Sequence, residues 1–390
     1  MGPDTVAVVL DPDALMAQAR AATGLDDFGD PWFMTPFRKV IELVNAEGGL
    51  TKADADPVLL LIGALADRLR MVRYLNENPR VFDEQVDVAA FIIGWPRGGS
   101  TLLQRLLCSS PRLTGACWWE LLNPLPLTPD LSDDCEDRKH LAVATMNAMY
   151  EKWPKMRSQH PLKPFDVDEE VMLFDRSFMS LMWQAYFYIP SYLDWLSGQD
   201  QARAYEEMLL WLKIISYQRP DKAGQRWILK SPQHMLAGGL KHAFAAMPGA
   251  KAIITHRTLQ KVATSYASMI DTTIAQWSAT YDPRKYGRDS IRLFQRSVDH
   301  FMQVRADPQF ADRFIDVRFE DTFERPVDVF GDVLGQLGMQ VGEADLAAAR
   351  AWMDANGRET HPPHTYSPED YGMTAEEIDA AFAAYHGQYL

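Results

Sequence analysis

The stretch "FIIGWPRGGSTLLQRLL", residues 91–107, constrains the fold of this chain more than any other part of the sequence. An apolar run leads into a glycine-rich turn, and leucines at helical spacing follow the turn. This order predicts a buried strand, a tight turn and the start of a helix. The first N–H groups of a helix have no partners within it, so they can bind an anion, and we expect a phosphate-type ligand here.

The turn matches the P-loop pattern G-x-x-x-x-G-K-[ST] at all but one informative position. Gly94, Gly99 and Thr101 stand where the pattern requires them, whereas Ser100 replaces the lysine. Arg97 places a cation inside the loop instead. The sequence therefore predicts an anion held by loop amides, hydroxyl groups and an arginine, without the P-loop lysine.

Four short β-rich runs are separated by helical segments that are long enough to serve as crossover connections. This alternation predicts a parallel sheet covered by helices, that is, an α/β, P-loop-like three-layer fold. The runs are "AAFIIGW" (89–95), "RWILK" (226–230), "AKAIITH" (250–256) and "RFIDVRF" (313–319).

We interpret residues 1–390 as a single domain with helical additions. Residues 1–85 show repeated helix start and stop signals and form a helical N-terminal extension. Residues 86–340 form the α/β core, and an insertion at 116–220 within it is rich in aromatic residues and methionine. Residues 341–390 form a tail that ends in a helix opened by a capping box, Thr374-x-x-Glu377.

The charge and cysteine content exclude several classes of protein. A net charge of -14 argues against nucleic-acid or anionic-membrane binding, because both require a basic face. The three cysteines form no CxxC pair, which is typical of a reducing compartment. The start of the chain lacks a basic region, and the apolar run at 178–189 is too short to span a bilayer. We therefore expect a cytoplasmic protein without an integral membrane segment.

Two further strand ends carry cations. Arg257 follows the third β-rich run, and Ser265 lies about two turns into the next predicted helix. Lys230 ends the second run, directly before Ser231 and Pro232. Because ligands of an open α/β sheet bind outside the carboxyl ends of its strands, we expect these residues at the same edge as the glycine turn.

The combination of "PRGGST", "LLQRLL", "LKSP" and "THR" with a serine eight residues after the arginine resembles sulfotransferases that use 3′-phosphoadenosine 5′-phosphosulfate (PAPS). The motifs are most similar to those of a divergent bacterial branch of this family, whose motifs resemble those of tyrosylprotein sulfotransferases. The resemblance covers most of the chain from about Val88 onward. The resemblance implies a 5′-phosphosulfate site formed by Arg97, Gly98, Gly99, Ser100 and Thr101. It also implies a 3′-phosphate site formed by Arg257 and Ser265.

The resemblance also implies a catalytic set. A transferring sulfuryl group carries less negative charge than a γ-phosphoryl group, so Arg97 and Lys230 could position and stabilise it without a metal. Glu120 in "ACWWELLNP" follows the loop helix, as the catalytic glutamate of tyrosylprotein sulfotransferases does, and is the candidate base. His234 is the alternative base, although cytosolic sulfotransferases place their histidine two residues after the lysine rather than four.

Other parts of the family pattern are missing or open. The C-terminal Arg-Lys-Gly motif of cytosolic sulfotransferases is absent, which leaves His364 and Tyr366 as tail candidates for covering the nucleotide. The "HPPH" spacing at 361–364 alone suggests metal ligands, and we assign no metal site. The insertion suits a hydrophobic small-molecule or lipid acceptor with a hydroxyl group.

Two alternative functions are compatible with the loop. One is a P-loop kinase or NTPase, although the lysine is missing and only two apolar residues precede Asp316 where a Walker B strand would be. The other is a non-catalytic nucleotide-binding protein, which would need the loop but not Lys230.

Overall fold

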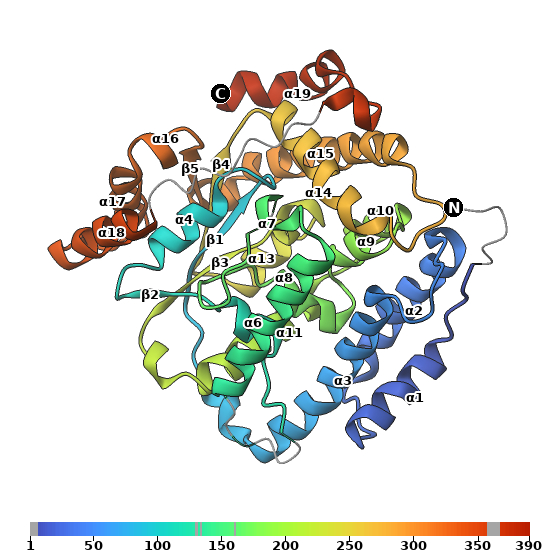
Figure 1. Cartoon of the computed structure of the whole chain (residues 1–390). Coiled ribbons are helices and arrows are strands. Elements are labelled where there is room, and N and C mark those ends of the chain that lie inside the picture. Colours follow the sequence, from blue (N-terminus) through green and yellow to red (C-terminus); the bar gives the residue numbers. More distant parts are fainter. Residues whose placement is uncertain (1–6, 129–131, 133–134, 160, 357–366) are drawn as a thin grey trace.

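A five-stranded parallel sheet forms the centre of the protein, in the order β2-β3-β1-β4-β5. The computed structural model describes residues 7–128, 132, 135–159, 161–356 and 367–390. Figure 1 shows the sheet between two layers of helices. The strands are β1 (Val88–Gly94), β2 (Leu113–Thr114), β3 (Arg226–Lys230), β4 (Lys251–His256) and β5 (Phe314–Arg318).

The predicted parallel α/β fold is confirmed, and each of the four predicted strands starts and ends within one residue of an observed strand. Strand β2 was not predicted, because its two residues pair with β3 only through the tertiary arrangement. Alternate side chains of β1 point to opposite faces of the sheet. Phe91 and Ile93 join the main core, while Ala90 and Ile92 join a second core on the other face.

Helices on both faces complete the three layers. The second core contains side chains of α4 (Ser100–Leu107), α17 (Pro326–Gln336) and α18 (Glu343–Asn356). The main core includes α12 (Gln233–Leu236), α13 (Leu240–Ala246), α14 (Leu259–Ile274), α15 (Pro283–Ala306) and α19 (Ala375–Tyr389). A short helix, α16 (Asp321–Glu324), follows β5.

The N-terminal segment is helical, as its capping signals predict. Its helices are α1 (Pro12–Thr23), α2 (Met34–Leu43) and α3 (Asp56–Glu77), drawn in blue in Figure 1. The Asp11 side chain accepts the N–H groups of Asp13 and Ala14 at the start of α1. A buried ion pair of 2.5 Å between Arg68 and Glu207 ties α3 to the insertion.

The insertion contributes seven α-helices that the structure describes, and they pack beside the sheet and the N-terminal helices. None of the helices in the described ranges is long and apolar enough to cross a membrane. The helices of the insertion are α5 (Trp118–Leu122), α6 (Cys135–Lys152), α7 (Met156–Gln159), α8 (Val171–Phe174), α9 (Met182–Tyr186), α10 (Ser191–Ser197) and α11 (Ala202–Tyr217).

Candidate active site at the carboxyl edge of the sheet

The turn between β1 and α4 has a backbone that requires glycine. Gly99 has a φ of 79°, and a Cβ atom there would lie 3.1 Å from the Phe319 ring and 3.2 Å from Thr322 Oγ1. A Cβ atom at Gly98 would lie 2.8 Å from the Trp95 carbonyl oxygen. Arg97 also has a positive φ, which is uncommon for a residue other than glycine. The loop is therefore held in one tight conformation beside the start of α4.

The structure brings the two other cationic strand ends, at Lys230 and Arg257, to this loop. Ile92 of β1 pairs with Lys230 of β3, and Gly94 pairs with Thr255 of β4, so the carboxyl ends of these strands are neighbours. Lys230 Nζ donates to Thr101 Oγ1 at 3.0 Å.

Arg257 reaches the same loop from β4. Its guanidinium group donates to the carbonyl oxygen of Arg97 and lies 3.9 Å from the centroid of the Phe319 ring. Ser265 lies on α14, six residues beyond the start of that helix, and is partly exposed.

Glu169 completes the cluster at Lys230, and sequence reasoning missed it. Its Oε1 atom lies 2.5 Å from Lys230 Nζ. The Lys230 side chain is only 2% exposed, whereas the Glu169 side chain is 24% exposed. A buried cation and an accessible carboxylate therefore meet beside the glycine-rich loop. The two neighbouring acidic residues Glu169 and Glu170, just before α8, were the only hint of this contact in the sequence. No local sequence pattern links Glu169 to Lys230, which lies 61 residues away.

His234 is enclosed in a hydrogen-bonded chain directly behind Lys230. Its Nε2 atom lies 2.8 Å from Glu170 Oε1, and its Nδ1 atom lies 2.9 Å from the Tyr205 hydroxyl oxygen. Glu170 Oε2 accepts the backbone N–H of Lys230 at 2.8 Å. The His234 side chain is fully buried, and both ring nitrogens are engaged. His234 is therefore better suited to position Lys230 than to contact an acceptor molecule.

Glu120 occupies a different environment from Lys230. Its carboxylate pairs with Arg219 and with Lys222, whose Nζ atom is 2.6 Å away. It also accepts the backbone N–H of Cys117 at 2.7 Å, which forms a capping box at the start of α5. The Glu120 side chain is 2% exposed. The structure thus places Glu120 in a buried ion-pair cluster with Arg219 and Lys222. The acidic residue that contacts Lys230 is Glu169 instead.

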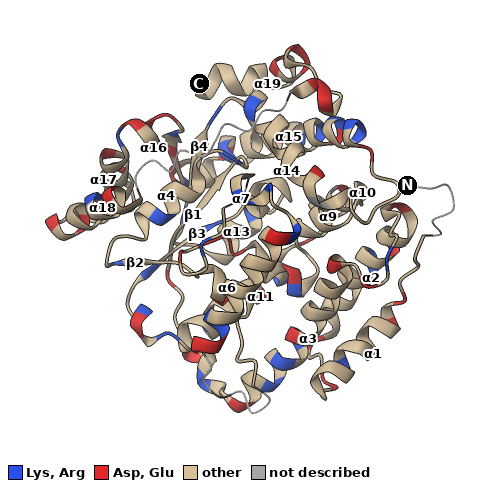
Figure 2. Ribbon diagram, in the orientation of Figure 1, with Lys and Arg blue, Asp and Glu red and all other residues tan. Residues whose placement is uncertain are grey.

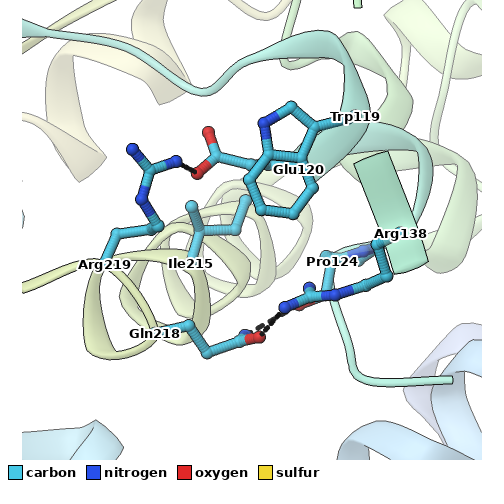
Figure 3. A pocket seen from close by; sticks show the side chains of 7 residues that line it. All are labelled: Trp119, Glu120, Pro124, Arg138, Ile215, Gln218 and Arg219. Atoms are coloured by element: carbon cyan, nitrogen blue, oxygen red, sulfur yellow. Dashed lines mark hydrogen bonds and ion pairs between the residues drawn. The ribbon is translucent and has the colours of Figure 1, made fainter. Parts of the chain in front are cut away.

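A small hollow lies beside Glu120 (Figure 3). Its volume is about 10 Å³, roughly the space that a single water molecule needs and far too little for a small-molecule substrate. Its polar groups are already used: Arg138 donates to Gln218 Oε1 at 2.8 Å, and Arg219 pairs with Glu120. The hollow is lined by Trp119, Glu120, Pro124, Arg138, Ile215, Gln218 and Arg219. We therefore do not place the acceptor there.

The C-terminal helix α19 connects the ends of β1 and β4. The Tyr385 hydroxyl accepts from Trp95 Nε1 at 3.0 Å and lies 2.8 Å from His256 Nδ1. Trp95 opens the glycine-rich loop, and His256 directly precedes Arg257. His256 Nε2 also lies 2.8 Å from Asp316 Oδ1. Burial raises the pKa of Tyr385 above its usual value, so the hydroxyl stays protonated. The predicted tail candidates His364 and Tyr366 lie outside the described residues.

Removing the Tyr385 hydroxyl is expected to destabilise the protein. In Tyr385→Phe, the indole N–H of Trp95 and the imidazole of His256 lose a buried partner, which costs about 1–3 kcal/mol of unfolding free energy. Chemical denaturation of the wild type and the variant measures this. An unchanged midpoint would contradict the role of Tyr385 as the link between the two strand ends.

The acidic net charge is distributed over the outer helices. Figure 2 shows Asp and Glu on many outer segments and basic residues interspersed among them. Among the described residues, no group of three or more His, Cys, Asp or Glu side chains could hold a metal ion, and the "HPPH" segment lies outside the described residues.

Comparison with known proteins gives one consistent family. Residues 89–343 match the sequence model of the sulfotransferase family. The structure is similar to that of sulfotransferase STF1 from Mycobacterium tuberculosis H37Rv, with a TM-score of 0.81 and 28% identity over 96% of this chain and 99% of that chain. It also shares the fold of sulfotransferase STF9 from Mycobacterium avium, with a TM-score of 0.83 and 20% identity over 100% of this chain and 98% of that chain. No curated protein sequence matches the chain.

Proposed function

Because this chain belongs to the sulfotransferase family, whose donor is PAPS, we propose that it transfers a sulfuryl group to a hydroxyl group of a hydrophobic small molecule or lipid. The observation that carries this proposal is the cluster of Lys230, Thr101 and Glu169 beside the glycine-rich loop. It combines a buried cation, a hydroxyl donor and an accessible carboxylate at one strand end, which are the groups that transfer to an alcohol requires.

The loop residues fit the 5′-phosphosulfate end of PAPS. A Cβ atom at Gly98 or Gly99 would meet neighbouring protein atoms, so the tight turn that sets the loop beside the N-terminus of α4 requires glycine at both positions. The residues assigned to this end are Arg97, Gly98, Gly99, Ser100 and Thr101, and those assigned to the 3′-phosphate are Arg257 and Ser265. The contact between Arg257 and the Arg97 carbonyl supports one continuous anion site across the two strand ends.

The transfer step needs a base and a stabiliser of the leaving group. The acceptor oxygen forms a bond to sulfur while the bond between sulfur and the bridging phosphate oxygen breaks. Glu169 accepts the proton of the acceptor hydroxyl, and Lys230 and Arg97 stabilise the negative charge on the leaving phosphate. PAPS supplies the activated sulfuryl group, and 3′,5′-ADP is the other product.

Among the three candidate bases, Glu169 has the geometry that the role requires. A general base must come within hydrogen-bond distance of the proton that it removes. Glu169 is accessible and in contact with Lys230, whereas Glu120 is enclosed by two cations and His234 by Glu170 and Tyr205. We therefore assign the base role to Glu169 in place of Glu120 or His234.

The acceptor side is proposed to lie over the insertion. Met149, Met156 and Met172 are partly buried and pack against both the main core and a smaller aromatic cluster. Unbranched methionine side chains adapt to ligands of irregular shape. This composition supports an apolar acceptor.

Nucleotide stabilisation tests the proposal against the two alternatives. We expect 3′,5′-ADP to raise the melting temperature in the absence of Mg²⁺. The increase should be larger than the one that ATP with Mg²⁺ produces. A ligand at 100 times its Kd stabilises the folded protein by about 2.7 kcal/mol. Incubation with labelled PAPS and a panel of alcohols, followed by mass detection, tests transfer. Stabilisation by ATP–Mg²⁺ alone would favour the kinase or NTPase alternative. Nucleotide binding without any transfer would favour the non-catalytic one.

The Arg257→Ala variant tests the 3′-phosphate assignment. It is expected to weaken 3′,5′-ADP by about 10- to 150-fold, the equivalent of about 1.5–3 kcal/mol for a charge-assisted contact, while 5′-AMP binding changes much less. Calorimetric titration of both nucleotides measures the difference. Arg325→Ala, which removes an exposed arginine from a surface ion pair, is the control. Equal losses for 3′,5′-ADP and 5′-AMP would refute the assignment.

A further inference from the structure

The aromatic ring of Phe319 contacts both the glycine-rich loop and Arg257. Phe319 is the residue directly after β5. A Cβ atom at Gly99 would lie 3.1 Å from its Cδ2 atom and 3.3 Å from its Cε2 atom, so this edge of the ring packs against the loop backbone. The guanidinium carbon of Arg257 lies over the ring, 3.9 Å from its centroid. One side chain therefore contacts the loop assigned to the 5′-phosphosulfate and the arginine assigned to the 3′-phosphate.

Hydrogen bonds of its own backbone fix the position of Phe319. Its N–H donates to the carbonyl oxygen of His256, the residue directly before Arg257, at 2.9 Å. Its carbonyl oxygen accepts the Thr322 hydroxyl at 2.6 Å and the Thr322 N–H at 3.2 Å. The Thr322 side chain is buried, and the centroid of the Phe323 ring lies 4.9 Å from that of Phe319. Phe319 is therefore a fixed point at the carboxyl edge of the sheet.

Arg257 belongs to a short connection rather than to a helix or a strand. It stands between the end of β4 at His256 and the start of α14 at Leu259, and it is partly exposed. An arginine side chain has several rotatable bonds, so ordering it around a ligand has an entropic cost. The contact with the Phe319 ring restricts these rotations before a ligand arrives.

Two different kinds of contact hold the Arg257 guanidinium at the loop. The Phe319 ring attracts its positive charge, as aromatic rings attract cations that lie over their face. One of its N–H groups donates to the carbonyl oxygen of Arg97. A guanidinium group carries five N–H donors, so a phosphate can be bound by the same group that makes these contacts. Arg257 is thereby held between a ring that follows β5 and a carbonyl group of the turn between β1 and α4.

We propose that Phe319 is a positioning residue for the donor nucleotide: its ring holds the Arg257 guanidinium in the place where it binds the 3′-phosphate. The inference rests on the proposed PAPS site, and it adds a residue that acts through Arg257 rather than on the reacting atoms. Because the arginine is ordered before the nucleotide binds, less of the free energy of the phosphate contact is lost in ordering it. Loss of the ring should therefore weaken nucleotides that carry a 3′-phosphate and spare those that lack it.

Nucleotide titrations of variants without the ring test the inference. Phe319→Leu and Phe319→Met keep an apolar side chain against Gly99 but remove the ring beneath Arg257, and two replacements of different shape guard against a folding defect in one of them. Calorimetry should show 3′,5′-ADP bound about 5- to 30-fold more weakly, the range for a lost cation–π contact, while 5′-AMP affinity stays within about twofold. Phe319→Tyr keeps the ring and should retain the wild-type affinity for 3′,5′-ADP.

Two results of these titrations would overturn the inference. Equal losses for 3′,5′-ADP and 5′-AMP would mean that the ring contacts the nucleoside itself and does not act through Arg257. Unchanged 3′,5′-ADP affinity in Phe319→Leu and Phe319→Met would mean that Arg257 is ordered without the ring.

A double-mutant cycle shows whether the effect depends on Arg257. In an Arg257→Ala background, Phe319→Leu should cause no further loss of 3′,5′-ADP affinity, because the group that the ring positions is absent. The control is Phe28→Leu, the same change at a ring whose centroid lies 4.9 Å from the Arg20 guanidinium carbon in the N-terminal segment. It should leave both nucleotide affinities unchanged. Additive losses in the double variant, or a comparable loss in Phe28→Leu, overturn the inference.

Sulfate transfer from PAPS separates the inference from the proposed function. At saturating PAPS, Phe319→Leu should keep the wild-type kcat, while its KM for PAPS rises by about the factor lost in 3′,5′-ADP affinity. Selective loss of 3′,5′-ADP binding in the variant, with no transfer to any alcohol by the wild type, would contradict the proposed function and retain the positioning role. A KM for PAPS that Arg257→Ala raises and Phe319→Leu leaves unchanged would retain the function and overturn the positioning role.

Discussion

Replacing Glu169 by Gln is expected to lower turnover by about 10²- to 10⁴-fold, the usual range for the loss of a general base. The amide keeps the shape of the side chain but cannot accept the acceptor proton. Binding of 3′,5′-ADP should stay within a few-fold of wild type, because a base acts on the acceptor in the transition state. The measurements are turnover with one accepted alcohol, nucleotide affinity and melting temperature.

Glu120→Gln is the matched control for this prediction. Both glutamates pair with a buried lysine, but only Glu169 is accessible. Glu120→Gln leaves the buried Lys222 without its anionic partner, whereas Arg219 keeps its ion pair with Asp221, and the change is expected to cost about 3–5 kcal/mol of stability. Turnover per folded molecule should fall far less than in Glu169→Gln. An inactive, folded Glu120→Gln protein beside an active Glu169→Gln protein would establish Glu120 as the base instead.

Replacing Lys230 by Met is expected to lower turnover by about 10²- to 10³-fold through lost stabilisation of the leaving phosphate oxygen. The side chain is 2% exposed, and its ammonium group contacts both Thr101 and Glu169. In a buried site, a charge–charge interaction is stronger than in water, so the loss should be large. Single-turnover kinetics with saturating PAPS measures the transfer step directly.

The control for Lys230→Met is Lys222→Met, which removes the other glutamate-paired buried lysine. Lys222 donates to the Gly115 carbonyl at 2.7 Å and pairs with Glu120, so its loss should lower stability and not the rate of transfer in folded protein. Rapid transfer by Lys230→Met would remove Lys230 from the catalytic set. If a folded Lys222→Met protein transferred no sulfuryl group, Lys222 would also be needed for transfer, and the distinction drawn between Lys230 and Lys222 would be wrong.

The local sequence determined four of the five strands and the glycine-rich loop. The strands at 88–94, 226–230, 251–256 and 314–318 are short apolar runs, whose burial depends mainly on their own composition. Gly98 and Gly99 are required by the backbone of their own turn. Lys230 and Arg257 could be placed at the loop from sequence, since they end strands that must be neighbours in a parallel sheet.

The tertiary structure alone decided which acidic residue lies at Lys230. Glu120 follows the loop helix closely in sequence, yet its carboxylate is used to cap α5 and to pair with Lys222 and Arg219. Glu169 reaches Lys230 because the long insertion folds back onto the end of β3, a contact between residues that no helical or strand periodicity relates.

The same reason applies to the C-terminal helix and to contacts within the insertion. Tyr385 reaches Trp95 across 290 residues, and Asp175 meets Tyr186 only because the turns between α8 and α9 bring the two side chains together. Sequence patterns report the periodicity of one segment at a time. Contacts between segments depend on how the whole chain buries its apolar surface, and here they decided which acidic residue contacts Lys230.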